Sequence, residues 1–338
     1  MITKKIHGTT PEGNTVYLYT ISNQDYSVSV STYGGALVSF SGKDAFGNMG
    51  NVLLSYGTLS EYVNSSTYLG YTIGRVANRI SNGTFQLDGK TYTLQTNDHD
   101  KHTLHSGVHG FSSRIFDSEI LENRLVLSLK SEDGDQGFPG EVDLSVTFSL
   151  EDDGALRIRY VGRCSERTPL NITNHAFFNL SCEKDILSHI LRLDCDRYVE
   201  TDGEKIPTGR VLEVRKTPFD FTLPKRIGSG LKDVGGYDHC MIRKGKTDLS
   251  KPLAVVCDPI SRRKLEVFTT LEAVQFFTGN SLDGAGVSPD GIPYRKYHGF
   301  CLETQHYPDS VNNPHFPSTI YDADHPFDHT TIYKLGLC

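Results

Sequence analysis

The feature that most constrains the fold of this chain is a strict alternation of apolar and polar residues. In EVDLSVTFSL (141–150), an apolar residue occupies every second position, and the turn residues Asp152, Asp153 and Gly154 follow. The alternation resumes over residues 156–160. A period of two interrupted by a short turn is typical of an antiparallel hairpin with one buried face.

Two further stretches predict hairpins of the same kind. TFQLDGKTYTL (84–94) turns at Asp88-Gly89, and LAVVCDPISRRKLEVFTT (253–270) turns around Asp258-Pro259. Helical periodicity is limited to TLSEYVNS (58–65), which predicts one short helix capped by Thr58 or Ser60. We therefore expect an all-β fold, a large antiparallel β-sandwich with few short helices, in a single domain over residues 1–338.

Charge and composition narrow the function classes. The net charge is −7, and the longest basic cluster is Ser-Arg-Arg-Lys at 261–264, so nucleic acid is not an expected partner. The chain lacks an apolar run of the roughly 20 residues that a membrane-spanning helix needs, and its first residues lack the apolar core of a secretory signal. The seven cysteines form no C-x-x-C pair, which predicts a reduced, cytoplasmic protein without a disulfide framework.

Polar and charged residues interrupt the strand pattern at five places. Singly, each has a structural explanation, because core histidines and turn aspartates are common. Together they supply two carboxylates, two histidines, an arginine and an asparagine beside aromatic rings, a set that suits a ligand with many hydroxyl groups. The stretches are GRVANRI (74–80), HTLHSG (102–107), TNHAFFNL (173–180), GGYDHC (235–240) and HGFCLETQ (298–305).

Other chemistries have weaker support in the sequence. The histidines at 99, 102, 105 and 109 superficially resemble a metal site, but they form no H-E-x-x-H pattern, so we expect no metal. Phosphate-binding loops, dinucleotide-binding glycine motifs and a G-x-S-x-G nucleophile elbow are all missing from the sequence. Asp238 and Glu303 could be the two carboxylates of a glycosidase, and the residues alone leave that alternative open.

The five stretches, together with EAVQFFTGN (272–280) and the continuation CLETQHYPDSVNNPHFPSTI (301–320), resemble the motifs of the aldose 1-epimerase (galactose mutarotase) family. The matches occur in the family's order from about residue 34 to residue 334. The resemblance implies a large β-sandwich that interconverts the α and β anomers of a free aldose such as galactose or glucose, without metal or cofactor. It also implies that the protein is a monomer or a homodimer.

The resemblance also assigns roles to single residues. It places the catalytic general acid at His175 and the general base at Glu303. Because opposite charges attract, we expect Glu303 to stay ionised and His175 to be protonated more readily. The resemblance implies that the substrate-binding residues are Asn78, Arg79, His105, Asp238 and Gln275.

Three features depart from the family pattern. Ser106 stands where glycine is common and Cys240 where asparagine is frequent, and we expect both at the rim of the site with an effect on sugar preference. STIYDADHPFDHTTIYK (318–334) is expected to be a variable surface loop. Two other functions stay open: a non-catalytic sugar-binding or regulatory protein, and a glycosidase or lyase on a related sandwich.

Overall fold

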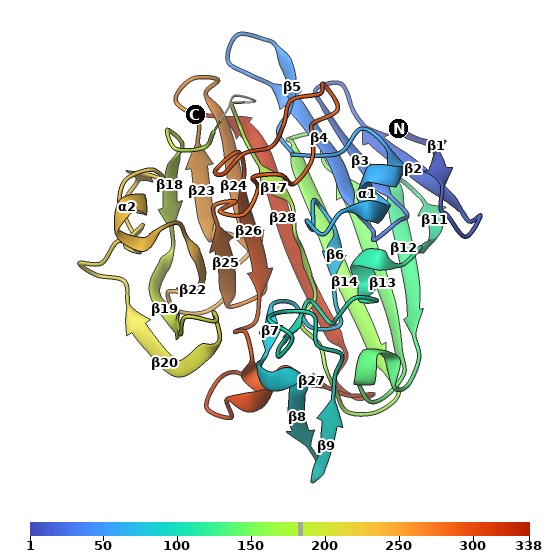
Figure 1. Ribbon diagram of the computed structural model, residues 1–338. Coiled ribbons are helices and arrows are strands. Elements are labelled where there is room, and N and C mark those ends of the chain that lie inside the picture. The colour runs from blue at the N-terminus through green and yellow to red at the C-terminus, as the bar shows by residue number, and fades with distance from the viewer. Residues whose placement is uncertain (182–184) are drawn as a thin grey trace.

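The computed structural model describes residues 1–181 and 185–338 and consists mainly of strands (Figure 1). All pairs of named strands among these residues are antiparallel. The one parallel contact among them is an isolated bridge between Val76 and Asn171. Each of the three predicted hairpins is present. Asp88 and Gly89 both have positive φ, 52° and 77°, as the tight two-residue turn requires. The prediction of an all-β sandwich is confirmed.

The largest sheet has nine strands and forms one layer of the molecule. In spatial order it contains β11 (Asp117–Leu121), β12 (Arg124–Ser131), β13 (Val142–Leu150), β14 (Ala155–Cys164), β28 (Phe327–Leu337), β24 (Arg263–Thr269), β23 (Ala254–Cys257), β18 (Ile190–Leu193) and β21 (Lys225–Arg226).

Two other large sheets complete the sandwich. The six-stranded sheet contains β17 (Phe177–Phe178), β26 (Phe300–Gln305), β25 (Ala273–Phe277), β22 (Asp238–Arg243), β19 (Cys195–Thr201) and β20 (Pro207–Glu213). The five-stranded sheet contains β1 (Ile2–Thr9), β2 (Thr15–Ser22), β3 (Tyr26–Ser31), β4 (Leu37–Lys43) and β5 (Met49–Asn51).

Short elements connect these sheets. The two-stranded pairs are β6 (Thr72–Ile73) with β16 (Thr173–Asn174), β7 (Arg79–Ile80) with β10 (Thr103–Leu104), β8 (Thr84–Leu87) with β9 (Lys90–Thr93), and β15 (Thr168–Pro169) with β27 (Ile320–Tyr321). The two α-helices of the described residues are α1 (Leu59–Asn64) and α2 (Leu231–Val234).

Helix α1 begins where the sequence predicts. The Thr58 hydroxyl accepts from the backbone N–H of Glu61 at 3.3 Å, and the Glu61 carboxylate accepts from the backbone N–H of Thr58 at 2.9 Å. This reciprocal capping box satisfies two backbone donors at the helix start. Both helices are far shorter than a bilayer is thick, and the described residues contain no helix long and apolar enough to cross a membrane.

One continuous core lies between the three large sheets. It is built from fully buried residues such as Val30 of the five-stranded sheet, Val267 of the nine-stranded sheet and Phe276 of the six-stranded sheet. Figure 1 shows β25 and β26 in front of β24 and β28. The Tyr333 hydroxyl on β28 donates to the backbone oxygen of Leu302 on β26 at 3.1 Å, which ties these two layers together.

The expected surface loop at 318–334 is wrong for its second half. Residues 327–337 form β28, which pairs with β14 on one side and β24 on the other, near the middle of the nine-stranded sheet. Phe327 and Tyr333 are buried in the core. Apolar and polar residues do not alternate strictly in FDHTTIYKLGL (327–337), so the period of two does not reveal this central strand.

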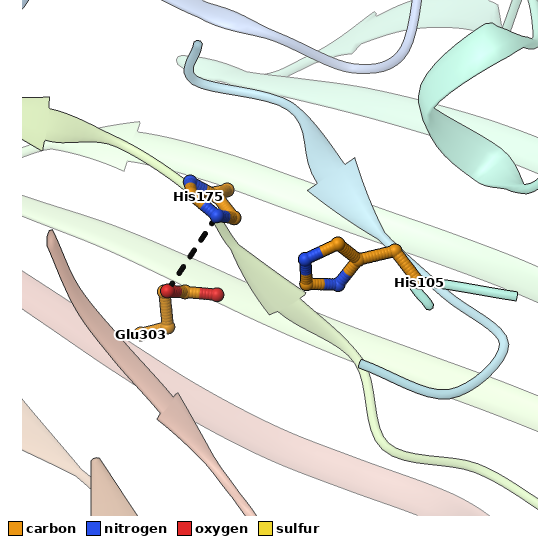
Figure 2. Close-up of side chains that lie close together, drawn as sticks. All are labelled: His105, His175 and Glu303. Atoms are coloured by element: carbon orange, nitrogen blue, oxygen red, sulfur yellow. Dashed lines mark ion pairs between the residues drawn. The ribbon is translucent and has the colours of Figure 1, made fainter. Parts of the chain in front are cut away.

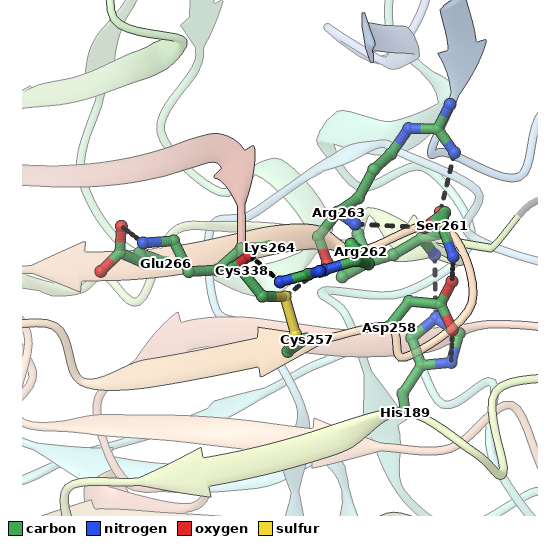
Figure 3. Close-up of a disulfide and its surroundings, with 10 residues drawn as sticks. His189, Cys257, Asp258, Ser261, Arg262, Arg263, Lys264, Glu266 and Cys338 are labelled. Atoms are coloured by element: carbon green, nitrogen blue, oxygen red, sulfur yellow. Dashed lines mark hydrogen bonds and ion pairs between the residues drawn. A yellow bond between two sulfur atoms is a disulfide. The ribbon is translucent and has the colours of Figure 1, made fainter. Parts of the chain in front are cut away.

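The expectation of a reduced protein is wrong for one pair of cysteines. Cys257, at the end of β23, and Cys338, just beyond β28, are bonded to each other, with 6.3 Å between their Cα atoms (Figure 3). The backbone N–H of Cys338 donates to the oxygen of Arg262 at 2.9 Å, so the C-terminal residue is also held by the β23–β24 turn. Cys164, Cys195, Cys240 and Cys301 are free and buried, and Cys182 lies outside the described residues.

This disulfide is expected to stabilise the fold. It joins residues with a sequence separation of 81. A cross-link of this kind limits the conformations of the unfolded chain and so raises the free energy of unfolding by about 2–4 kcal/mol. Replacing Cys338 with Ser should therefore lower the denaturation midpoint under oxidising conditions. Wild-type protein in reductant should match the variant; a variant as stable as the oxidised wild type would contradict this expectation.

Candidate functional site

The six-stranded sheet turns one face to the core and the other to a pocket. On β26 and β25, Leu302 and Phe276 point into the core, so their strand neighbours Glu303 and Gln275 point the other way. Gln275 and Glu303 are directly opposite each other in the ladder, and Asp238 begins the next strand, β22. The period of two thus explains how a carboxylate enters an apolar strand: it occupies the face that does not belong to the core.

Two residues with left-handed backbone conformation, Asn78 and His105, line the pocket opposite the sheet. Asn78 and His105 have φ of 64° and 53°, values that asparagine and histidine tolerate better than most residues. The backbone N–H of His105 donates to the oxygen of Asn78 at 3.0 Å, and the N–H of Asn78 donates to Nδ1 of His105 at 3.1 Å. This reciprocal pair fixes the imidazole ring over the sheet.

The pocket has a volume of about 280 Å³. All seven residues that the sequence singles out as catalytic or substrate-binding line it, although they come from segments spread over more than 200 residues. The predicted residues are Asn78, Arg79, His105, His175, Asp238, Gln275 and Glu303. The rest of the lining consists of residues that the sequence does not single out: Ser66, Thr67, Tyr68, Leu104, Phe177, Lys205, Phe277 and Ser281.

His175 and Glu303 face each other at the bottom of this pocket. Nε2 of His175 lies 3.6 Å from Oε1 of Glu303, and both side chains are buried, with 8% and 3% of their surface exposed (Figure 2). The ring of His105 lies edge-on to that of His175, with 5.4 Å between centroids, and Tyr68 packs against both rings. The ring of Phe177 packs against that of His175, with 5.0 Å between the centroids.

The charges of this pair differ from those expected. Burial raises the pKa of Glu303 well above its ordinary value, and the negative charge of Asp238 raises it further. Burial lowers the pKa of His175 to about 4, although its own backbone and Asp238 oppose the shift. Desolvation outweighs the mutual attraction, so the expectation of a readily ionised pair is wrong for this structure: burial shifts the pKa of each group toward its uncharged form.

His105 is held in one hydrogen-bonding state. Burial lowers its pKa well below the ordinary value, and the neighbouring His175 and Arg79 lower it further, so the ring is neutral near pH 7. Nδ1 accepts from Asn78, and therefore the single ring hydrogen of the neutral form is on Nε2. His105 can thus donate a hydrogen bond from this nitrogen.

This state decides against a metal site. Candidate ligand atoms of His105, His175 and Glu303 lie within 4.8 Å of one another, close enough to surround a cation. A ligating histidine, however, donates from its second nitrogen to an acceptor, whereas Nδ1 of His105 is itself an acceptor. The geometry suits hydrogen bonding better than coordination.

Two ion pairs hold charged side chains of the pocket lining, Arg79–Asp98 and Lys205–Asp238. Nε of Arg79 donates to the Asp98 carboxylate at 2.8 Å. The Asp238 carboxylate accepts from Nε2 of Gln275 at 2.8 Å and also from the ammonium of Lys205. Burial acts to raise the pKa of Asp238, but Lys205 and Gln275 outweigh it and the pKa is lowered, so this carboxylate is ionised.

The two substitutions expected at the rim lie elsewhere. The Ser106 hydroxyl accepts from the backbone N–H of Val76 at 2.7 Å, and its φ of 68° explains why glycine also suits this position. Cys240 is buried among apolar residues on β22. Neither is part of the pocket lining, so the expected effect on sugar preference has no contact to support it.

The sequence pattern does not predict Tyr68 and Lys205 as pocket residues. Tyr68 follows a short polar loop, and Lys205 lies in the β19–β20 turn, where a lysine is usually a solvated surface residue. Neither position interrupts a strand pattern, unlike the seven predicted residues. Only the fold brings them to the pocket.

Comparisons with known proteins agree with this geometry. The family model for aldose 1-epimerase matches residues 17–334. Galactose mutarotase of Homo sapiens is 38% identical over 341 residues, covering 99% of each chain, and aldose 1-epimerase of Escherichia coli is 35% identical over 316 residues, covering 91% of each. A solved structure of an aldose epimerase homologue from C. elegans superimposes with a TM-score of 0.90 at 26% identity, covering 95% of this chain and 98% of that one.

These matches do not favour the alternatives of a non-catalytic sugar-binding protein or a glycosidase. They extend over nearly the whole chain, and the residues that suggested the resemblance converge on one pocket. The chain belongs to the aldose 1-epimerase family.

Proposed function

We propose that this protein interconverts the α and β anomers of a free aldohexose such as galactose or glucose in the pocket on the outer face of the six-stranded sheet. The observation that carries the proposal is the facing pair His175–Glu303, 3.6 Å apart, within a ring of groups that bind hydroxyls. Apolar faces of Phe177 and Phe277 complete the lining, as a sugar ring requires.

Glu303 is the general base and His175 the general acid of this proposal. Opening a cyclic hemiacetal removes the proton from O1 and adds one to the ring oxygen, and rotation about C1–C2 lets the ring close on either face. The same two groups then act in reverse. Neither electrons nor a leaving group enters the balance, so the reaction demands no cofactor.

The neutral pair already has the right number of protons for this reaction. The pair as a whole carries one titratable proton in this form; burial favours its place on Glu303, and the reactive arrangement has it on His175 instead. The two forms differ only in where that proton lies, so the pair titrates as a unit. Hydroxyl groups of a bound sugar solvate the carboxylate, which favours the transfer of the proton from Glu303 to His175.

Asn78, Arg79, His105, Asp238 and Gln275 are proposed to hold the sugar. Arg79 and His105 donate hydrogen bonds, Asp238 accepts them, and the amides of Asn78 and Gln275 can do both. The cytoplasmic location, the single domain and the state of monomer or homodimer stay predictions.

A polarimetric assay tests the function directly. Wild-type protein should accelerate the approach of freshly dissolved α-D-galactose or α-D-glucose to the anomeric equilibrium, after subtraction of the spontaneous rate in the same buffer. An unchanged rate with both sugars would contradict the proposal. Release of new reducing ends from a disaccharide would instead support a glycosidase.

The pH dependence of kcat/KM should follow the shared proton. Activity is lost in acid when the pair takes up a second proton, because no base is then left. Since the pKa of His175 is lowered to about 4, the acidic limb should lie near pH 4 and not near the ordinary histidine value of about 6.5. A limb near 6.5, measured by polarimetry across buffers of constant ionic strength, would contradict this assignment.

A further inference from the structure

The turn between β19 and β20 reaches the edge of the sugar pocket. The Asp202 carboxylate accepts from the backbone N–H groups of Glu204 and Ile206, at 2.9 and 3.0 Å, which shapes the turn. Lys205 takes a left-handed conformation with a φ of 64°, and its side chain lines the pocket. A lysine of a surface turn thereby becomes part of the pocket lining.

Both oxygens of the Asp238 carboxylate are engaged from this side. Oδ1 accepts from the amide of Gln275 at 2.8 Å, and Oδ2 accepts from the ammonium of Lys205. Each carboxylate oxygen can accept more than one hydrogen bond, so Asp238 can also receive a sugar hydroxyl. Because Lys205 has three N–H donors, it too can reach a second acceptor.

The turn is anchored independently of this contact. The Glu204 carboxylate accepts from Nζ of Lys101 at 2.7 Å and lies 3.2 Å from Nε2 of His102. These contacts fasten the turn to the segment before His105. Lys205 is therefore held at the pocket edge by a neighbour, and its own ammonium is available to Asp238.

Lys205 is the cation directly bonded to Asp238. The other titratable groups facing this carboxylate are Arg79, which is bonded to Asp98, and His239, His175 and Glu303. Burial lowers the pKa of His239 and of His175, so neither contributes a positive charge near pH 7.

We propose that Lys205 is a positioning residue of the sugar site, which aims the Asp238 carboxylate at a sugar hydroxyl and offers an N–H group to a neighbouring hydroxyl oxygen. The inference rests on the proposed function, because it names a further residue of the same site. It assigns to the turn a role in substrate affinity. Asp238 in turn acts on Glu303, whose pKa its negative charge raises.

Replacing Lys205 with Met removes the ammonium and keeps most of the aliphatic stem. A charged hydrogen bond at a site that is 46% exposed supports an increase in KM of roughly three- to twentyfold, with a smaller change in kcat. Without the ammonium, the pKa of Asp238 rises, and the acidic limb of kcat/KM should move to higher pH. Lys205→Arg should restore most of the affinity, since it keeps the charge.

Lys216→Met is the matched control. Like Lys205, Lys216 has a left-handed backbone conformation, with a φ of 63°, but it is exposed and is not part of the pocket lining. We expect KM and the pH profile of this variant to stay close to the wild type. If Lys216→Met reproduced the change of Lys205→Met, or if Lys205→Met left both quantities unchanged, the proposal would be overturned.

Calorimetric titration with galactose measures the same contact without turnover. The dissociation constant of Lys205→Met should increase by a similar factor, and an unchanged constant would overturn the inference. Failure of the proposed function has a different signature, because wild-type protein would then bind galactose without accelerating its mutarotation.

Discussion

Replacing Glu303 with Gln is expected to lower kcat by about 10²–10⁴-fold with a small change in KM. The amide has the size of the carboxyl group and fills the same place on β26, so the fold and the pocket should persist. It cannot take the O1 proton, however, and the reaction loses its base. Initial rates of mutarotation of α-D-galactose, followed by polarimetry, measure the effect.

His175→Asn should cause a loss of similar size, because the acid and the base exchange one proton. For the same reason, the double variant should be little worse than either single one. Glu272→Gln is the matched control: this glutamate is bonded to His306 at 2.8 Å and is not part of the pocket lining, so its substitution should leave kcat near the wild-type value. Full activity of Glu303→Gln would remove the base from the mechanism.

The period of two predicts which face of a strand is buried, but not which strand is its neighbour. It places Glu303 and Gln275 on the faces opposite Leu302 and Phe276, and the structure confirms hairpins wherever a short turn joins two such strands. The period of two does not predict the order of the strands in a sheet. β28 lies between β14 and β24, and its partners are 60 to more than 170 residues away in the chain. Pairing at such distances depends on the packing of the whole core, which a local pattern does not contain.

The candidate site was predictable where polar residues interrupt strands. All seven predicted residues line one pocket, whereas Tyr68 and Lys205 come from segments in which polar residues are ordinary. The direction of the pKa shifts was not predictable either. It depends on how much water the surrounding side chains remove from His175 and Glu303, and this sum requires the three-dimensional structure.

The two arginines of GRVANRI show how one motif serves both the fold and the site. Arg75 is 2% exposed and donates to the backbone oxygens of Ser131, Glu132 and Pro139 at 2.7–2.9 Å. Its pKa is lowered by burial to about 10, so it is still a cation at neutral pH. Arg79, four residues later, lines the pocket instead.

Arg75→Met is therefore expected to be the most destabilising substitution considered for this chain. It leaves the backbone oxygens of the buried residues Ser131 and Pro139 without this donor, at about 1–3 kcal/mol each, and removes a third, partly buried bond to Glu132, against a total stability of about 5–15 kcal/mol. The variant should unfold at a much lower denaturant concentration, measured by circular dichroism, or fail to accumulate as folded protein. A denaturation midpoint equal to that of the wild type would contradict the structural role of Arg75.

Arg79→Met separates this effect from loss of function. It removes the same charge from the same motif, but its guanidinium bonds to Asp98 at the pocket wall and not to core carbonyls. We expect this variant to keep most of its stability and to bind the sugar more weakly, so that KM rises. A fold lost in Arg75→Met and a substrate affinity lost in Arg79→Met would show that the motif connects the core to the sugar pocket, since two arginines four positions apart in one segment serve the one and the other.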